Sequence, residues 1–288
     1  MNRLYIVGNL ETIMSGVNQT VPEGQPRQLP DGTGFASHVS MKSPLRKYVG
    51  QKDGPVWQEL AQELGITNPK NFLIAEDNGR GFDNPDEDVR KNLARFLELS
   101  LEEKRLGYWD LRSFGGTYLA KGNKKQTYAA AGGINVFPAL SVAPVQIQNV
   151  TLTAQAIKDV DVKDDQDRGM APGAWRVVEH GLYVFRANVC ATRMHTSGCT
   201  EQDVMVFLKA LPYLWSENPS TTRTCVRWIT LNLIEHSRKL GGCPEHLIDA
   251  ALAPRVLKSP PTKLADYEVP QTLPDDLKAR VKSIRSLI

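Results

Sequence analysis

The sequence predicts an α+β protein built on a ferredoxin-like βαββαβ core that carries insertions. Segments of strand and helix type follow one another in the order strand, helix, strand, strand, helix, strand. Two strand-like segments near the middle of the chain flank an acidic insert. The chain has 288 residues, of which 41% are hydrophobic and 23% charged. It can therefore bury a substantial core, as one large domain or two small ones.

This prediction depends mainly on residues 144–193. Apolar and β-branched residues recur in PVQIQNVTLT at its start and in RVVEHGLYVFRANV at its end, which predicts a strand at each place. The segment between them has no apolar periodicity, carries four aspartates from Asp161 to Asp167, and ends with Met170 and Trp175 among turn-forming residues. It is either a projecting hairpin or a flexible loop. A plain surface loop is the simpler interpretation, but long loops in compact domains are often functional.

The N-terminal part begins with a predicted strand at Leu4–Val7. Residues 14–34 are rich in Gly, Pro, Asn and Gln, so we expect a loop that only a partner would order. SHVSMKSPLRKYV then predicts a helix that Ser37 can cap. Pro44 removes a helical hydrogen bond, so it is expected to be tolerated if the helix proper begins near Ser43.

Lys42, Arg46 and Lys47 give this segment a local positive charge. On a helix, Lys42 and Arg46 share a face because they are four residues apart. The cluster is either a solvated basic face, the usual fate of such residues, or a phosphate-binding site.

Further along, residues 54–64 predict a helix that stops at Gly65, and a second helix is expected from Asn84 to about Gly107. YWDLRSFGGTYLA is predicted to be a strand, with Arg112 close to a Gly-Gly pair where the backbone can approach another group. The loop that follows carries Lys121, Lys124 and Lys125.

The C-terminal third starts with a predicted helix capped by Thr200. Residues 225–237 fit a strand or a helix equally well, and residues 257–274 resemble a linker. The last segment predicts an amphipathic helix capped by Thr272, with an apolar face made by Leu277, Val281, Ile284 and Ile288.

The composition and the motifs exclude several classes of function. The net charge of +3 weakly favours a polyanionic partner. His195 with Cys199, and Cys243 with His246, could each supply two metal ligands, but neither pair has a recognised zinc spacing, so we expect reduced thiols and no cofactor or metal. Walker, dinucleotide-binding, zincin and nucleophile-elbow motifs are absent. Without a signal peptide or a membrane-spanning run, we expect a cytoplasmic protein with no membrane partner.

Three segments in the same order resemble a known family. DLRSFGG at 110–116 is similar to the D-x-R-x-F-G motif of the backbone ("seven") subunit of type I CRISPR interference complexes, known as Cascade. SHVSMKSPLRKYV resembles that family's first helix, although Ser43 and Pro44 depart from it. PVQIQNVTLT, the acidic insert and HGLYVFRANV resemble its strand, thumb and strand. The resemblance extends to about residue 215 and is closest to the I-B and I-C subfamilies.

The resemblance implies a single RNA-recognition-motif (ferredoxin-like) palm over 1–288, with a finger insert near 50–106 and a thumb β-hairpin at 155–175. Members of this family, which belongs to the RAMP superfamily of antiviral defence proteins, polymerise head to tail along CRISPR RNA and are not enzymes in type I systems. The implied partners are CRISPR RNA, the target DNA strand, neighbouring copies of the chain, and the five-type, eight-type and small subunits.

Carried over to this chain, the family's RNA contacts fall on the first helix, the motif and the thumb. Sequence-independent RNA binding needs phosphate contacts from cations and apolar wedges that stack on bases. Trp175 has an alternative role, which is to pack into the palm as the first residue of the returning strand. The implied RNA-binding residues are Ser37, His38, Lys42, Arg46, Lys47, Arg112, Arg168, Met170 and Trp175.

Three competing functions remain. An RNA-cleaving backbone subunit of a type III-like complex would use Asp31, which the PDG sequence otherwise explains as a turn residue. A subunit that processes precursor RNA would use His38 or His180, but neither has a visible catalytic companion. The third alternative is a structural protein whose motif matches are accidental.

Overall fold

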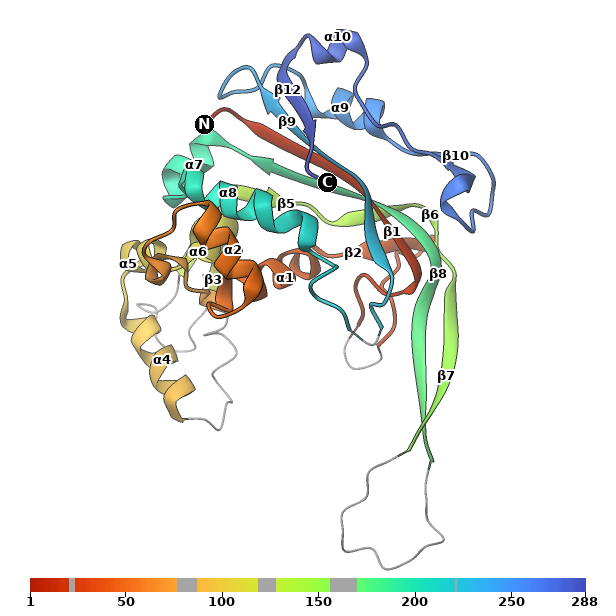
Figure 1. Cartoon of the computed structure of the whole chain (residues 1–288), viewed down its shortest axis with the longest axis horizontal. Coiled ribbons are helices and arrows are strands. Elements are labelled where there is room, and N and C mark those ends of the chain that lie inside the picture. The colour runs from red at the N-terminus through yellow and green to blue at the C-terminus, as the bar shows by residue number, and fades with distance from the viewer. Residues whose placement is uncertain (21–23, 77–86, 119–127, 156–169, 221) are drawn as a thin grey trace, which may run out of the picture.

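The protein is built around one eight-stranded, mainly antiparallel sheet, seen in a computed structural model (Figure 1) that describes residues 1–20, 24–76, 87–118, 128–155, 170–220 and 222–288. The strand order is β12-β9-β1-β8-β6-β2, and β5 and β7 also pair with β8. This confirms the expected mixture of helices with a mainly antiparallel sheet. The strands are β1 (Leu4–Ser15), β2 (Thr33–Ala36), β5 (Ile134–Val136), β6 (Ala139–Pro144), β7 (Ile147–Gln155), β8 (Met170–Val189), β9 (Val226–His236) and β12 (Val281–Ser286).

Helices cover both faces of the sheet. In β1, Leu4 and Ile6 pack into the larger core, whereas Tyr5 and Val7 point to the opposite face, as the alternation of a strand requires. Both faces of β1 are therefore buried, which explains its continuous apolar run. On the larger core lie α1 (His38–Gly50), α2 (Pro55–Glu63), α6 (Trp109–Phe114), α7 (Ala191–Ser197) and α8 (Glu201–Ala210), and on the smaller one lie α9 (Glu245–Leu252) and α10 (Asp275–Lys278).

A third, smaller apolar cluster lies beside the larger core. The helix expected from Asn84 to Gly107 is wrong as a single unit, because Ser100 caps a new helix through a capping box with Glu103. The strand expected from Tyr108 is also wrong up to Phe114, where the chain is helical. Asn84, Lys121, Lys124 and Lys125 lie outside the described residues. The elements here are η1 (Pro69–Phe72), α4 (Glu87–Glu98), α5 (Leu101–Gly107), β3 (Gly115–Tyr118) and β4 (Tyr128–Ala131).

Strands β7 and β8 form a two-stranded arm. Their antiparallel register runs without interruption from Ile147 opposite Val178 to Gln155 opposite Met170. The arm extends away from the sheet on the same side as α4 in the view of Figure 1. The acidic insert at 156–169, with Arg168, lies outside the described residues.

The described part of the 14–34 loop is ordered by contacts within the chain, contrary to the expectation that a partner would be needed. Strand β1 continues to Ser15, beyond its predicted end. The Gln19 side-chain amide donates to the Arg176 carbonyl at the root of the β7–β8 arm (3.2 Å). Asn18 accepts hydrogen bonds from Ser37 at the start of α1. The loop thus joins the arm to the first helix.

The expected C-terminal amphipathic helix is wrong. After the short helix α10, the chain forms strand β12, which pairs with β9 and leaves Val281 buried. The undecided segment 225–237 is the strand β9 itself, and its open edge provides the backbone partners for β12. The expected linker contains β10 (Arg255–Val256), η4 (Leu264–Asp266) and β11 (Tyr267–Glu268), and α8 is followed by η3 (Leu211–Tyr213). Among the described residues, no helix is both long and apolar enough to cross a membrane.

Candidate nucleic-acid interface

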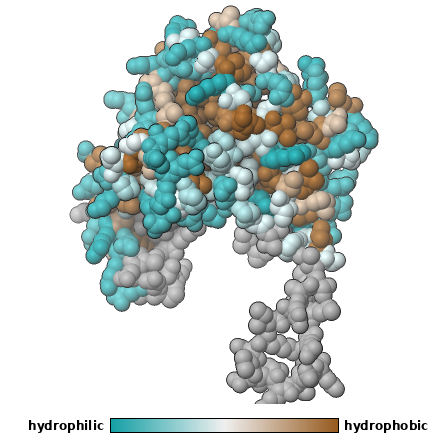
Figure 2. Space-filling model, viewed as in Figure 1, coloured by the Kyte–Doolittle hydropathy of each residue, from teal (hydrophilic) through white to brown (hydrophobic). Residues whose placement is uncertain are grey.

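Helix α1 lies between the α4 region and the root of the β7–β8 arm in Figure 1. Ser37 caps this helix, as the sequence predicted, because its hydroxyl accepts a hydrogen bond from the Ser40 amide (3.2 Å). The same hydroxyl donates to Asn18 (2.8 Å). The space-filling view shows hydrophilic residues at the lower left of the molecule, where α4 lies in Figure 1 (Figure 2).

Pro44 does not delay the helix, contrary to the expected start near Ser43. Helix α1 begins at His38 and contains Pro44 in its interior. Pro44, Met41 and Leu45 are buried against the larger core. We attribute the tolerance of the proline to this packing, which offsets the missing backbone hydrogen bond.

Lys42 is a partly buried cation on α1. It forms no ion pair with a described residue. Burial, followed by the charge of Arg46, lowers the pKa of Lys42 to about 8, and Arg193 adds to this effect while Glu76 opposes it. A bound anion would relieve the repulsion from Arg46 and Arg193, which makes this ammonium a candidate for a phosphate contact.

Arg46 is held within the protein, one turn further along the helix. Its Nε donates to the Asp110 carboxylate (3.1 Å), and its Nη1 forms an ion pair with Glu76. Asp110 is buried and also accepts the backbone amides of Ala75 (2.7 Å) and Glu76 (3.1 Å). Burial raises the pKa of Asp110, while Arg46 and the two amides oppose that rise. The positive charge that Arg46 contributes to the site is therefore already paired with two carboxylates.

The Phe114 ring packs against two cations of α1, Lys42 and Arg46. Its ring centroid lies 5.4 Å from the Lys42 ammonium and 5.5 Å from the Arg46 guanidinium. The turn that follows requires glycine, because Gly115 has φ +74° and a Cβ there would lie 2.3 Å from the Ala130 carbonyl oxygen. The D-x-R-x-F-G segment thus positions the cations of α1.

Arg112 has a structural role, contrary to the predicted RNA contact. Only 6% of the residue is exposed. Its guanidinium forms a two-bond ion pair with buried Asp203 (2.7 and 3.0 Å). The remaining donors reach the carbonyl oxygens of Arg105 (2.7 Å), Leu106 (2.9 Å) and Asn71 (2.8 Å). Because its donors are occupied by these groups, the arginine links the α5–α6 region to α8.

Arg193 was missed by sequence reasoning, which considered only the histidine and cysteines of its segment. It projects from α7, and its charge is close enough to Lys42 to contribute to the lowered pKa of that lysine. Its Nη1 donates to Asn135, which in turn donates to Asn188 (3.0 Å). Arg193 has no ion pair with a described residue. Only the fold brings the Arg193 charge within reach of Lys42, so no local pattern could have revealed it.

The other predicted contacts on α1 are exposed. Burial, then Lys42 and Arg46, lower the pKa of His38, so it is neutral near pH 7 and can donate or accept a hydrogen bond. Lys47 is exposed and its Nζ lies 3.5 Å from the Asn218 amide oxygen. Lys47 therefore lies close to the segment that follows η3.

Trp175 is part of the β7–β8 arm. It pairs with Val150, is partly exposed and does not belong to the apolar cores. The alternative that it packs into the palm as the first strand residue is wrong, because β8 begins at Met170. Met170 pairs with Gln155 through its backbone, and Arg168 lies outside the described residues.

The residues of the competing functions have structural partners. Asp31 accepts the Thr33 backbone amide (2.9 Å), and this bond holds the pKa of its carboxyl below the usual range. His180 is buried against Glu11 (3.0 Å), which also accepts from Arg227 (2.7 Å). Within the described part of the chain, no group of three or more metal-binding side chains gathers.

Residues 2–272 match the family described as CRISPR-associated protein Cas7. The chain belongs to the Cas7 family. No curated protein matches this Cas7 chain in sequence. Two solved structures, described as "CRISPR RNA-guided surveillance complex, pre-nicking" and "CRISPR RNA-guided surveillance complex", resemble it with TM-scores of 0.49 and 0.44. Both are 15% identical to it and align with 82% of this Cas7 chain, and with 78% and 70% of their own.

Proposed function

We propose that this protein is a non-catalytic backbone subunit that binds guide RNA through its phosphates and presents the RNA for pairing with target DNA in a type I interference complex. The observation that carries the proposal is the basic site formed by Lys42 and Arg193. The Arg193 charge is close enough to Lys42 to help lower the pKa of that lysine, and neither cation forms an ion pair with a described residue. Membership of the family supports the same role.

The architecture supports this role through the strand order. Strands β9, β1, β8 and β6 are adjacent, with α1 after β1 and α8 after β8. We assign these elements to a ferredoxin-like palm, residues 50–106 to the finger insert and the β7–β8 arm to the thumb. In this assignment RNA runs beneath α1, between finger and thumb, and Trp175 on the arm offers a stacking surface for a base.

The non-catalytic part of the proposal is supported by the contacts of Asp31. Its carboxylate is used within its own turn, and strand β2 separates it from α1. A target-RNA cleavage assay with added divalent metal tests this part. We expect no cleavage by the wild-type protein and no difference in the Asp31→Ala variant. Metal-dependent cleavage that Asp31→Ala abolishes would establish the RNA-cleaving alternative.

RNA-dependent assembly tests the binding site itself. We expect Lys42→Glu with Arg193→Glu to prevent the large complex that the wild-type protein forms with guide RNA in size-exclusion chromatography. Lys278→Glu is the matched control, because it reverses an exposed charge on α10, on the opposite face of the sheet. An unchanged complex for the double variant refutes the site, provided that its circular dichroism shows a folded protein.

A further inference from the structure

A leucine stands exposed at the tip of a rigid turn between β9 and α9. Leu240 is 88% exposed, the largest fraction among the large hydrophobic residues that the structure describes. The turn closes through the Gly241 amide, which donates to the Arg238 carbonyl (3.1 Å), and Gly241 adopts φ +99°. His236 Nδ1 accepts the next amide, that of Gly242 (3.1 Å). The tip is therefore preorganised, which lowers the entropy cost of binding through it.

Basic side chains precede this leucine. Arg238 and Lys239 are exposed, and neither forms an ion pair with a described residue. A second exposed leucine, Leu257, is preceded by Arg255, which pairs with Glu268 (3.6 Å), and is followed by only one cation without an ion pair to a described residue, Lys258. The 238–240 tip thus combines an apolar knob with two uncompensated positive charges.

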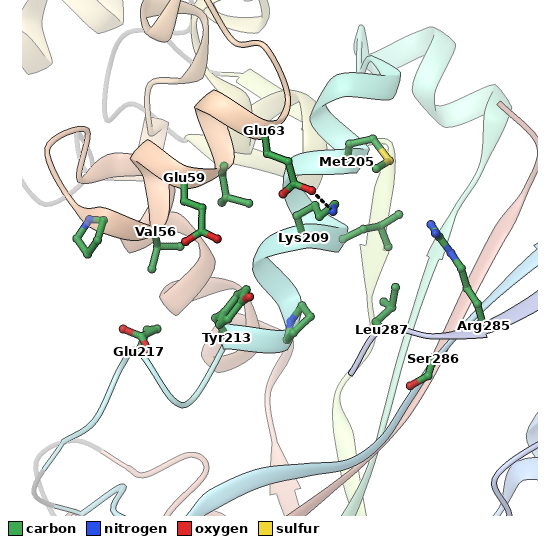
Figure 3. Close-up of a pocket in the computed structure, with 14 residues that line it drawn as sticks. Val56, Glu59, Glu63, Met205, Lys209, Tyr213, Glu217, Arg285, Ser286 and Leu287 are labelled. Carbon is green, nitrogen blue, oxygen red and sulfur yellow. Dashed lines mark hydrogen bonds and ion pairs between the residues drawn. The ribbon is translucent and has the colours of Figure 1, made fainter.

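A groove on another part of the surface has the complementary properties. It lies between α2, α8 and the C-terminal end of the chain and has a volume of about 630 Å³ (Figure 3). Its apolar surface comes from Val56, Leu60, Met205, Leu208 and Leu287. In Figure 3, Met205 and Leu287 face the same space as Val56 across the groove. A leucine side chain and the aliphatic stems of neighbouring basic residues can cover such a surface.

The rim of this groove is acidic. Glu63 is paired with Lys209, whereas Glu59 and Glu217 are exposed and have no ion pair with a described residue. These carboxylates would repel RNA phosphates, so a protein segment with basic residues fits better than nucleic acid. Arg285 is the cation on the opposite side of the groove.

We propose that the 238–240 tip of one copy docks in this groove of a second copy, with Leu240 on the apolar floor and Lys239 beside Glu59. Because tip and groove are different surfaces of one chain, the contact is heterologous and repeats from copy to copy along a filament. The inference rests on the proposed function, in which RNA brings copies side by side. It adds a protein–protein contact at a site separate from the RNA-binding helix.

Mixed cysteine variants test the contact. Leu240→Cys protein is mixed with Leu287→Cys protein on guide RNA under mild oxidation, and we expect a disulfide-linked dimer. The control replaces the first partner with Leu257→Cys, and each variant is also mixed with wild-type protein to account for the native cysteines. In a second experiment, the same mixtures are oxidised at high protein concentration without RNA, and we expect the same dimer at lower yield.

Charge reversal provides an independent readout. We expect Lys239→Glu or Glu59→Lys alone to weaken RNA-dependent assembly several-fold, and the two together to restore it. Wild-type assembly on RNA with no 240–287 dimer above the control overturns this contact and leaves the proposed function standing. If the wild-type protein does not bind RNA, the proposed function is overturned. The cross-linking experiment without RNA then tests the contact by itself.

Discussion

The lowered pKa of Lys42 predicts that RNA binding weakens as the pH rises through about 8. In the free protein, burial and Arg46 hold this pKa at about 8, against an ordinary value of 10.5. A phosphate favours the protonated form, so the RNA-bound protein keeps the proton to higher pH. The free protein is roughly 90% protonated at this lysine near pH 7 and roughly 10% near pH 9, so we expect about a tenfold loss of affinity between them.

The measurement is fluorescence anisotropy with an oligoadenylate, whose bases lose no proton in this range. Lys42→Arg supplies the decisive comparison, because arginine remains charged throughout and should give a nearly flat pH profile. Lys278→Arg on the opposite face of the sheet is the matched control and should keep the wild-type slope. If Lys42→Arg shows the same slope as the wild-type protein, Lys42 does not bind the phosphate and the reasoning fails.

Two further predictions concern residues placed by the fold. Arg112→Met leaves Asp203 buried without its partner, so we expect a loss of roughly 3–5 kcal/mol in the free energy of unfolding, measured with urea. RNA affinity measured well below the melting temperature should change little. A loss of RNA affinity with unchanged stability would instead show that Arg112 contacts RNA. Trp175→Ala should lower RNA affinity by about 1–3 kcal/mol without altering the unfolding midpoint, as expected for a stacking surface outside the core. A large fall in stability with unchanged RNA binding would instead make Trp175 a packing residue.

Local chemistry explains which elements could be predicted. Ser37 and Thr200 cap helices where the sequence suggested, because an N-cap depends on residues within one turn. The strands on either side of the acidic insert were also predicted, although the residues that pair them into an arm continue beyond the apolar pattern. The helix at residues 55–63 ends close to its predicted glycine.

The errors come from partners distant in sequence. Residues 281–286 have a helical apolar pattern but form a strand, because β9 offers them an open edge. Arg112 was expected to contact RNA, whereas the fold gives it the buried partner Asp203. Arg193 could not be identified from its neighbours, since its significance depends on the effect of its charge on Lys42, which is distant in sequence. Each of these outcomes is a tertiary contact that overrides a local signal.

The salt dependence of RNA affinity tests the central claim most directly. Each phosphate contact on single-stranded RNA contributes about −0.7 to the slope of log affinity against log salt concentration. The Lys42→Gln/Arg193→Gln variant should therefore show a slope shallower than that of the wild-type protein by about 1.4, whereas Lys278→Gln should leave it unchanged. A slope for the double variant equal to that of the wild-type protein would contradict the assignment of this site to RNA phosphates.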